Sequence, residues 1–222
     1  MMIEATLIDS MGTDMSVVNA ARVSFGKKSE WEGGSHPDFD PVWKLPERDS
    51  KLIKYLAKHK HFSPFGHAFA SFHVKAPVFV ARQLVKHKFL RWNEISRRYV
   101  DDVPEFYEPD VWRGRSADKK QGSEGVVDNL ELDQVPGGCL ANYLALIKYG
   151  VAPEQARMVL PQSTMTEWYW SGSLDAFADM CKLRCAADTQ QETRVIAQQI
   201  SKGMSELYPV SWEALTKEDK HE

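Results

Sequence analysis

A strand pattern passes directly into a helix pattern at Pro77. Residues 69–75 alternate between apolar and polar side chains, which is the period of a half-buried strand. Proline is tolerated as the first residue of a helix, and the apolar residues that follow it repeat at helical spacing. The sequence therefore predicts a strand over 69–75 and a helix over 77–89, joined without a loop.

Strand and helix patterns also interleave along the rest of the chain. They predict strands at 2–8 and 164–170, and helices at 16–23, 50–58, 140–149, 153–161 and from Thr189 onward. Ser16 is expected as an N-cap, and Thr189 with Glu192 as a capping box. The stretches 26–46 and 101–137 are interpreted as loops. This interleaving is typical of an α/β or α+β fold, and 222 residues are most simply one domain spanning 1–222.

Positive charge is concentrated in one segment. The chain has 28 Lys and Arg against 31 Asp and Glu, a net charge of -3, which argues against a general nucleic-acid or membrane-surface binder. Yet residues 82–99 read RQLVKHKFLRWNEISRRY, in which seven basic residues surround one acid, Glu94. A solvated basic face is the simpler interpretation. The interleaved Asn93, Ser96 and Tyr99 favour instead a site for a phosphorylated heterocycle, because they add oriented donors and acceptors to the charge.

Three arginines are candidates for ligand contacts. Arg98 and Arg157 could bind phosphate, because a guanidinium grips it with two parallel hydrogen bonds. A salt bridge to Glu154 is the alternative for Arg157. Arg184 lies in an apolar stretch, so it is either part of a buried ion pair or a ligand contact.

Histidines and cysteines do not form a metal or disulfide pattern. His59, His61, His67 and His73 lack the carboxylate or HxxxH partner of a catalytic metal site, so we expect no metal. The cysteines, Cys139, Cys181 and Cys185, are odd in number, and the latter two are interpreted as core residues. We therefore expect a reducing, cytoplasmic setting, with no signal peptide and no membrane span. Neither GxGxxG nor GxxxxGK[ST] is present, so any dinucleotide is held without those loops.

The basic segment resembles the hallmark of the flavin-dependent thymidylate synthase family. That hallmark is Arg-His-Arg, seven residues, then Ser, within a segment ending in NExSxRY; here it reads Lys86, His87, Lys88 and Ser96. Further blocks of the family are matched in the same order by AARVSF at 20–25, HFSPFGH at 61–67, FHVKAPVFVARQ at 72–83 and ARMVLP at 156–161.

The resemblance implies a fold, an assembly and a reaction. The fold would be a mixed central sheet flanked by helices, in a homotetramer whose active sites are shared between subunits. The reaction would methylate dUMP to dTMP, with methylenetetrahydrofolate as carbon donor, FAD as hydride carrier and NADPH as reductant of the flavin.

The resemblance also implies roles for individual residues. Arg184 and Ser96 would be catalytic, with Arg184 favouring the ionised uracil ring. The dUMP site would comprise Gln83, Lys86, Glu94, Ser96, Arg97, Arg98, Arg157 and Arg184, with Arg98 and Arg157 at the phosphate. The FAD site would comprise Ser24, Ser63, Lys86, His87, Lys88, Glu94 and Asp188. His61 would lie on the folate side, and Cys185 needs no catalytic role.

This chain departs from the family pattern on the flavin side. Lys86 and Lys88 keep the charge of the family's arginines but lose the planar fork. Asp188 stands where relatives commonly have histidine, and Ser173 and Asp175 replace an Asn and an Arg seen in some relatives. These departures leave two alternatives to the synthase: an enzyme that hydroxymethylates a pyrimidine nucleotide, and a dUMP-binding protein without flavin chemistry.

Overall fold

The protein is built on a four-stranded sheet in the order β1-β2-β6-β3. The computed structural model describes residues 2–33, 43–100, 102–117, 122–128 and 135–217. The strands are β1 (Glu4–Met11), β2 (Phe69–Pro77), β3 (Leu90–Glu94) and β6 (Met165–Ser173). Every pairing is antiparallel, so the expected mixed sheet is wrong in this respect. The reason is that β3, after helix α3, pairs with β6 and not with β2.

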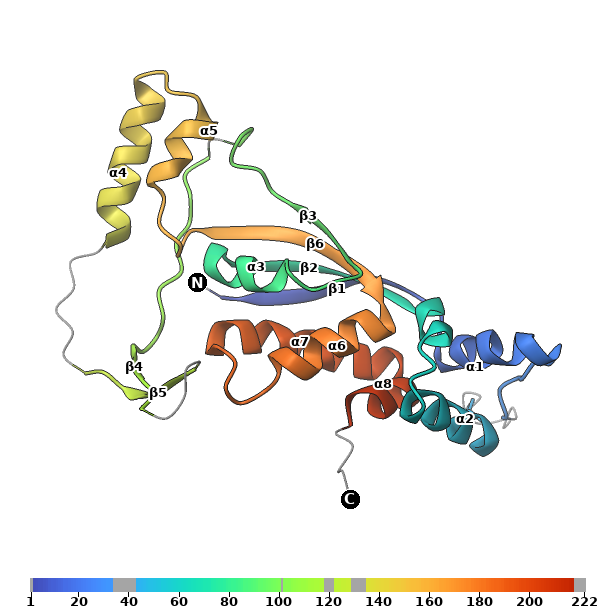
Figure 1. The fold of residues 1–222 in the computed structure, drawn as a ribbon. Coiled ribbons are helices and arrows are strands. Elements are labelled where there is room, and N and C mark those ends of the chain that lie inside the picture. Colours follow the sequence, from blue (N-terminus) through green and yellow to red (C-terminus); the bar gives the residue numbers. More distant parts are fainter. Residues whose placement is uncertain (1, 34–42, 101, 118–121, 129–134, 218–222) are drawn as a thin grey trace, which may run out of the picture.

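Helices cover one face of the sheet and extend from its ends (Figure 1). Below the sheet in this view lie α6 (Leu174–Arg184), α7 (Gln191–Leu207) and α8 (Pro209–Thr216). One end carries α1 (Asp14–Arg22) and α2 (Glu47–Lys58), and the other carries α4 (Val135–Lys148) and α5 (Pro153–Ala156). The short helix α3 (Val78–Leu84) contacts β2, β6 and α7. The remaining elements are the hairpin strands β4 (Arg113–Arg115) and β5 (Ser123–Val126) and the 3-10 turns η1 (Val23–Phe25), η2 (Ser63–His67) and η3 (Arg157–Val159).

The core lies between the sheet and α6 and α7. Alternate residues of β2 are buried, and Phe72 meets Phe177 of α6 edge to face, with ring centroids 5.4 Å apart. Ile196, Ile200 and Met204 recur at helical spacing on the buried side of α7. Burying one such side chain contributes about 1.5–3 kcal/mol, so these repeats fix which faces meet.

Helix α3 is shorter than predicted because the chain turns at Phe89. The helix ends at Leu84, not Phe89, and Phe89 adopts a left-handed backbone with φ 65°. Strand β3 then begins at Leu90, whose side chain occupies the space that Gly172 of β6 leaves open. The ring of Trp92 stacks on Trp168 with centroids 4.2 Å apart. Residues 90–94 of the basic segment therefore form a strand that the sequence patterns did not predict.

The predicted caps are wrong although their helices exist. Thr13 is the N-cap of α1, and Ser16 lies one turn in, where its hydroxyl accepts a hydrogen bond of 3.0 Å from the Thr13 N–H. Helix α7 begins after Gln190, and Glu192 pairs with Arg113 instead of capping.

The other predicted elements are present with shifted ends. Strands 2–8 and 164–170 appear as β1 and β6, and helices 16–23, 50–58 and 140–149 as α1, α2 and α4. The predicted helix 153–161 is the pair α5 and η3. Helices α6 and α8 were not predicted, and the 101–137 stretch contains the β4/β5 hairpin. Residues 34–42 of the predicted loop lie outside the described ranges, whereas Glu32 and Lys44 at its two ends form an antiparallel bridge.

Candidate active site

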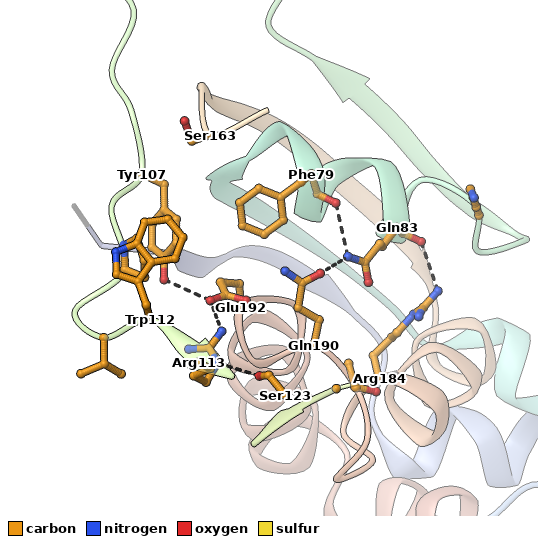
Figure 2. A pocket seen from close by; sticks show the side chains of 15 residues that line it. Phe79, Gln83, Tyr107, Trp112, Arg113, Ser123, Ser163, Arg184, Gln190 and Glu192 are labelled. Carbon is orange, nitrogen blue, oxygen red and sulfur yellow. Dashed lines mark hydrogen bonds and ion pairs between the residues drawn. The ribbon is translucent and has the colours of Figure 1, made fainter. Parts of the chain in front are cut away.

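A cavity of about 700 Å³ opens beside α3. Its wall comprises Phe79, Gln83 and Lys86 from α3 and the following turn, residues from 107–113 and 122–123, Ser163, and residues from 184–192 (Figure 2). Four segments distant in sequence thus meet here, and they bring together Gln83, Lys86 and Arg184 of the predicted site.

Two amide side chains face each other in this cavity. Gln83 Nε2 donates to Gln190 Oε1 at 2.5 Å and also lies 3.4 Å from the Phe79 carbonyl (Figure 2). Within the described part of the chain, Gln83 Oε1 and Gln190 Nε2 have no other partner. One acceptor and one donor therefore remain for a ligand, which is the complement of a uracil edge.

Arg184 is held by hydrogen bonds, not by an acid. Its Nε donates to His87 Nε2 at 2.9 Å, and its Nη2 donates to the Gln83 carbonyl at 3.3 Å. Burial lowers the pKa of His87 to about 4, and Arg184 lowers it as well, so His87 is a neutral acceptor at pH 7. Burial also lowers the pKa of Arg184 below its usual value. Among the described residues Arg184 has no ion pair, which removes the buried-ion-pair alternative.

The opposite wall carries an ion pair that the sequence did not reveal. Arg113 donates to Ser123 Oγ at 2.9 Å and pairs with Glu192, whose side chain is only 4% exposed (Figure 2). The Tyr107 hydroxyl lies 3.4 Å from the same carboxylate. The pKa of Tyr107 is raised, mainly by burial of the hydroxyl and secondly by the negative charge of Glu192. The 101–137 stretch showed no period from which these contacts could be predicted.

Four of the other five predicted nucleotide-binding residues line a second cavity, of about 520 Å³. Val78 and Arg82 of α3 line it, whereas Phe79 and Gln83 line the first, so the two cavities lie on different faces of α3. The predicted residues on its wall are Glu94, Ser96, Arg97 and Arg157.

Polar contacts orient three of these residues. Glu94 accepts hydrogen bonds from Thr166 at 2.6 Å and from the Trp92 indole at 3.1 Å. Arg97 donates to the Asp102 carbonyl at 2.5 Å. Arg157 donates to the carbonyl of Glu154 at 3.3 Å and not to its carboxylate, so the predicted salt bridge is wrong.

The remaining predicted residues lie outside both cavities. Arg98 is exposed above the Tyr99 ring, 5.1 Å from its centroid, and Lys88 is exposed in the turn before β3. Ser24 lies on η1, Ser63 begins η2, and His61 precedes it beside Tyr55 and His59. Asp188 follows α6, with its backbone against Gly122.

The cysteines and histidines form no further site in the described ranges. Cys181 is buried and Cys185 half-buried, and all three cysteines are free. No group of three or more His, Cys, Asp or Glu side chains gathers as metal ligands in the part of the chain that the structure describes. Likewise, none of the described helices has both the length and the apolar character needed to cross a membrane.

The first cavity has the chemistry of a site for an aromatic anion. Phe79, Tyr107 and Trp112 supply flat apolar surface, and Lys86 and Arg184 supply charge. Glu192 Oε2 is buried without a partner in the described structure. Cations, ring surfaces and an orphaned acceptor together fit a flavin or a nucleotide.

Comparisons with known proteins identify the family. The family model described as thymidylate synthase complementing protein (Thy1) matches residues 6–210. The chain belongs to the Thy1 family. This membership confirms the resemblance found in the basic segment.

Curated Thy1 relatives carry one activity name. A flavin-dependent thymidylate synthase of Thermus thermophilus is 41% identical over 212 residues, which cover 94% of this chain and 73% of that protein. A flavin-dependent thymidylate synthase of Thermosipho melanesiensis is 37% identical over 219 residues, which cover 95% of this chain and 89% of that protein.

A solved structure shares the fold. The UMP/dUMP methylase PolB from Streptomyces cacaoi, bound with 5-Br dUMP, superposes with a TM-score of 0.77 at 30% identity, over 97% of this chain and 95% of that one. The expectation of a fold that combines a sheet with helices is thereby confirmed, and because the sheet is antiparallel, the α+β alternative describes it.

Proposed function

We propose that this protein is a flavin-dependent thymidylate synthase, which methylates dUMP to dTMP. Family membership supports the reaction class, and the names of the relatives support the substrate. The observation that carries the proposal is the position of Arg184, fixed by two hydrogen bonds beside the Gln83 amide in an aromatic, cationic cavity.

Arg184 would stabilise negative charge on the uracil ring. Its Nε and Nη2 are held by His87 and by the Gln83 carbonyl, which leaves Nη1 available to a ligand. A guanidinium fixed in advance favours the ionised, enolate-like ring, because it does not have to reorganise as the charge develops. Gln83 Oε1 and Gln190 Nε2 would orient the ring edge, and Ser96 would act on the nucleotide from the second cavity.

The cofactor residues follow the resemblance. Reduced FAD would supply the hydride, with carbon from methylenetetrahydrofolate and flavin reduction by NADPH. Residues proposed to hold FAD are Lys86 at the first cavity and His87, which accepts a hydrogen bond from Arg184, with Ser24, Ser63, Lys88, Glu94 and Asp188. We place His61 on the folate side. The free cysteines are consistent with the cytoplasmic setting expected from the sequence.

We propose that two subunits share each site within a homotetramer. Gln83, Lys86 and Arg184 line one cavity, whereas Glu94, Ser96, Arg97 and Arg157 line another on a different face of α3. A nucleotide that contacts both sets is accommodated most simply between two copies, with its phosphate on Arg157 and Arg98 of one and its base on Arg184 of the other.

Anaerobic flavin spectroscopy tests the chemistry. The protein is loaded with FAD, reduced with NADPH, and mixed with dUMP and methylenetetrahydrofolate together or singly. The proposal predicts flavin oxidation only when both substrates are present. A protein that binds dUMP tightly but shows no flavin spectrum at any FAD concentration is the non-catalytic alternative. A parallel sample with UMP tests whether the ribonucleotide is accepted.

A further inference from the structure

A third cavity, of about 700 Å³, lies beside the segment that carries His61 and Ser63. It is formed by α2, α6, α8 and the turn between α2 and η2. Helices α2 and α8 pack side by side, away from α4 (Figure 1). None of its lining residues lines the two cavities described above.

The wall of this cavity is strongly basic. The lysines that line it are Lys54, Lys58, Lys60, Lys182 and Lys217. The acid among its described lining residues is Glu213, which lies 3.3 Å from Lys217. In the part of the chain that the structure describes, Lys54, Lys58 and Lys60 form no ion pair. In a chain of net charge -3, this concentration of cations creates a local positive potential that attracts anions.

The floor of the cavity is apolar. Leu215 is 4% exposed, and Ala57 and Ala214 are half-buried beside it. The Phe62 ring is 38% exposed and also lines the cavity. Cations around an apolar floor with a ring match a ligand that combines anionic groups with an apolar portion.

Lys60 occupies a backbone position that usually belongs to glycine. Its φ is 58°, and its N–H donates to Ala57 O at 3.1 Å where α2 ends. A side chain at a left-handed position after a helix carries a steric cost that glycine avoids. Lys60 therefore strains the turn while it places a cation on the wall of the cavity. Strain of this kind is characteristic of functional positions.

Helix capping accounts for only part of the cluster. Lys58 and Lys182 lie in the last turns of α2 and α6, where a cation offsets the partial negative charge of the carbonyls. Lys54 lies a full turn earlier in α2, and Lys60 lies beyond the helix. These two lysines add charge that the helix ends do not require.

We propose that this cavity binds a small polyanion: a ligand with two or more carboxylate or phosphate groups next to an apolar or ring portion. Two sources have this chemistry: the oligo-γ-glutamyl tail of a folate and the phosphates of a nicotinamide dinucleotide. The choice between these two sources rests on the proposed function, because each belongs to a substrate of that reaction. The proposal that the cavity binds a polyanion does not depend on it.

Calorimetric titration of the whole chain tests binding without turnover. The probes are tri-γ-glutamate and inorganic triphosphate, at low and at raised salt. Both anions bind the wild type, with affinity that falls as salt rises. Each exposed ion pair contributes up to about 1 kcal/mol, or about fivefold in affinity, so Lys58→Gln with Lys60→Gly weakens binding by up to about 25-fold.

Two further variants separate charge from folding. Lys51→Gln is the matched control, because Lys51 lies on the same helix, pairs with Glu47 and does not line the cavity. Lys60→Gly alone relieves the left-handed residue, so the melting temperature stays the same or rises while binding weakens. The proposal is overturned if neither anion binds the wild type, if the double variant binds equally well, or if Lys51→Gln weakens binding as much.

Steady-state kinetics distinguishes the sources. For the folate tail, the wild type has a lower KM for triglutamyl than for monoglutamyl methylenetetrahydrofolate, and the double variant loses that difference. For the dinucleotide, the KM for NADPH rises severalfold in the double variant while both folate values stay constant. If the protein binds the anions but leaves dUMP unchanged, the anion site stands and the proposed function is rejected. If the protein converts dUMP to dTMP but binds neither anion, only the anion site is rejected.

Discussion

Arg184 Nε donates a hydrogen bond to His87 Nε2 across 2.9 Å. An imidazole nitrogen accepts only when it carries no proton, so the contact requires neutral His87 with its proton on Nδ1. The second contact of Arg184, to the Gln83 carbonyl, comes from α3. The guanidinium of Arg184 is thus fixed from two sides, by the histidine of the motif and by the end of α3.

Replacing Arg184 should affect turnover more than binding. Loss of a preorganised cation that stabilises developing charge lowers kcat about 10²–10³-fold, whereas dUMP affinity depends largely on the phosphate contacts. We expect Arg184→Ala to show that drop in kcat with a much smaller change in the Kd for dUMP, measured by steady-state kinetics and titration. Arg48→Ala, an exposed arginine of α2, is the control. Turnover retained in Arg184→Ala removes this residue from the mechanism.

Acid should destabilise the protein through His87. Its pKa is about 4 in the folded chain against an ordinary 6.5, so between these values the unfolded chain binds more protons. The free energy of unfolding therefore falls as pH drops from about 6.5 to about 4 and is unaffected by this group above that window. Urea unfolding across the window should show a smaller decline for His87→Gln, which cannot titrate.

The same residue gives a second readout. His87→Gln keeps an acceptor for Arg184 and should retain more turnover than His87→Ala, which removes it. Equal turnover in the two variants would mean that the hydrogen bond does not position Arg184.

Breaking the Arg113–Glu192 pair should destabilise the fold. Arg113→Gln leaves a carboxylate with 4% exposure without its cation, at a cost of about 2–3 kcal/mol in the free energy of unfolding. Adding Glu192→Gln removes the buried charge, so the double variant should recover part of that loss. A double-mutant cycle by denaturant unfolding measures the coupling. Additive losses would show that the two side chains do not interact.

Shared sites predict complementation between two inactive variants. Arg157→Ala and Arg184→Ala alter different cavities, so a mixed oligomer contains some sites in which both residues are native. Subunits mixed under exchange conditions should regain a fraction of wild-type turnover. A mixture no more active than its separate components, with exchange verified by mass, would place each site within one chain.

The sequence predicted those helices and strands that depend on the local spacing of apolar residues. The β2 alternation and the helical period after Thr189 follow from side-chain direction along one element, so β2 and α7 were both predicted. The end of α3 was not predicted correctly. It depends on the left-handed backbone of Phe89 and on the space beside Gly172, and both are set by tertiary structure.

The resemblance implied site residues one by one but not their arrangement. It named Gln83, His87 and Arg184, which stay predictions as site residues, whereas the hydrogen bonds between them join positions about a hundred residues apart in the chain. Arg113 and Tyr107 come from a stretch without regular period and were missed. The separation of the predicted residues into two cavities depends on which faces of α3 meet their neighbours, which no single segment specifies.

The most direct test is the mass of the nucleotide product. The protein is incubated with dUMP, methylenetetrahydrofolate, FAD and NADPH, and the nucleotide is identified by mass spectrometry, with Arg184→Ala run beside it. The proposed function predicts dTMP from the wild type and little from the variant. A hydroxymethylated nucleotide, or dUMP that stays unchanged while the protein binds it, would contradict the assignment of this chain as a thymidylate synthase.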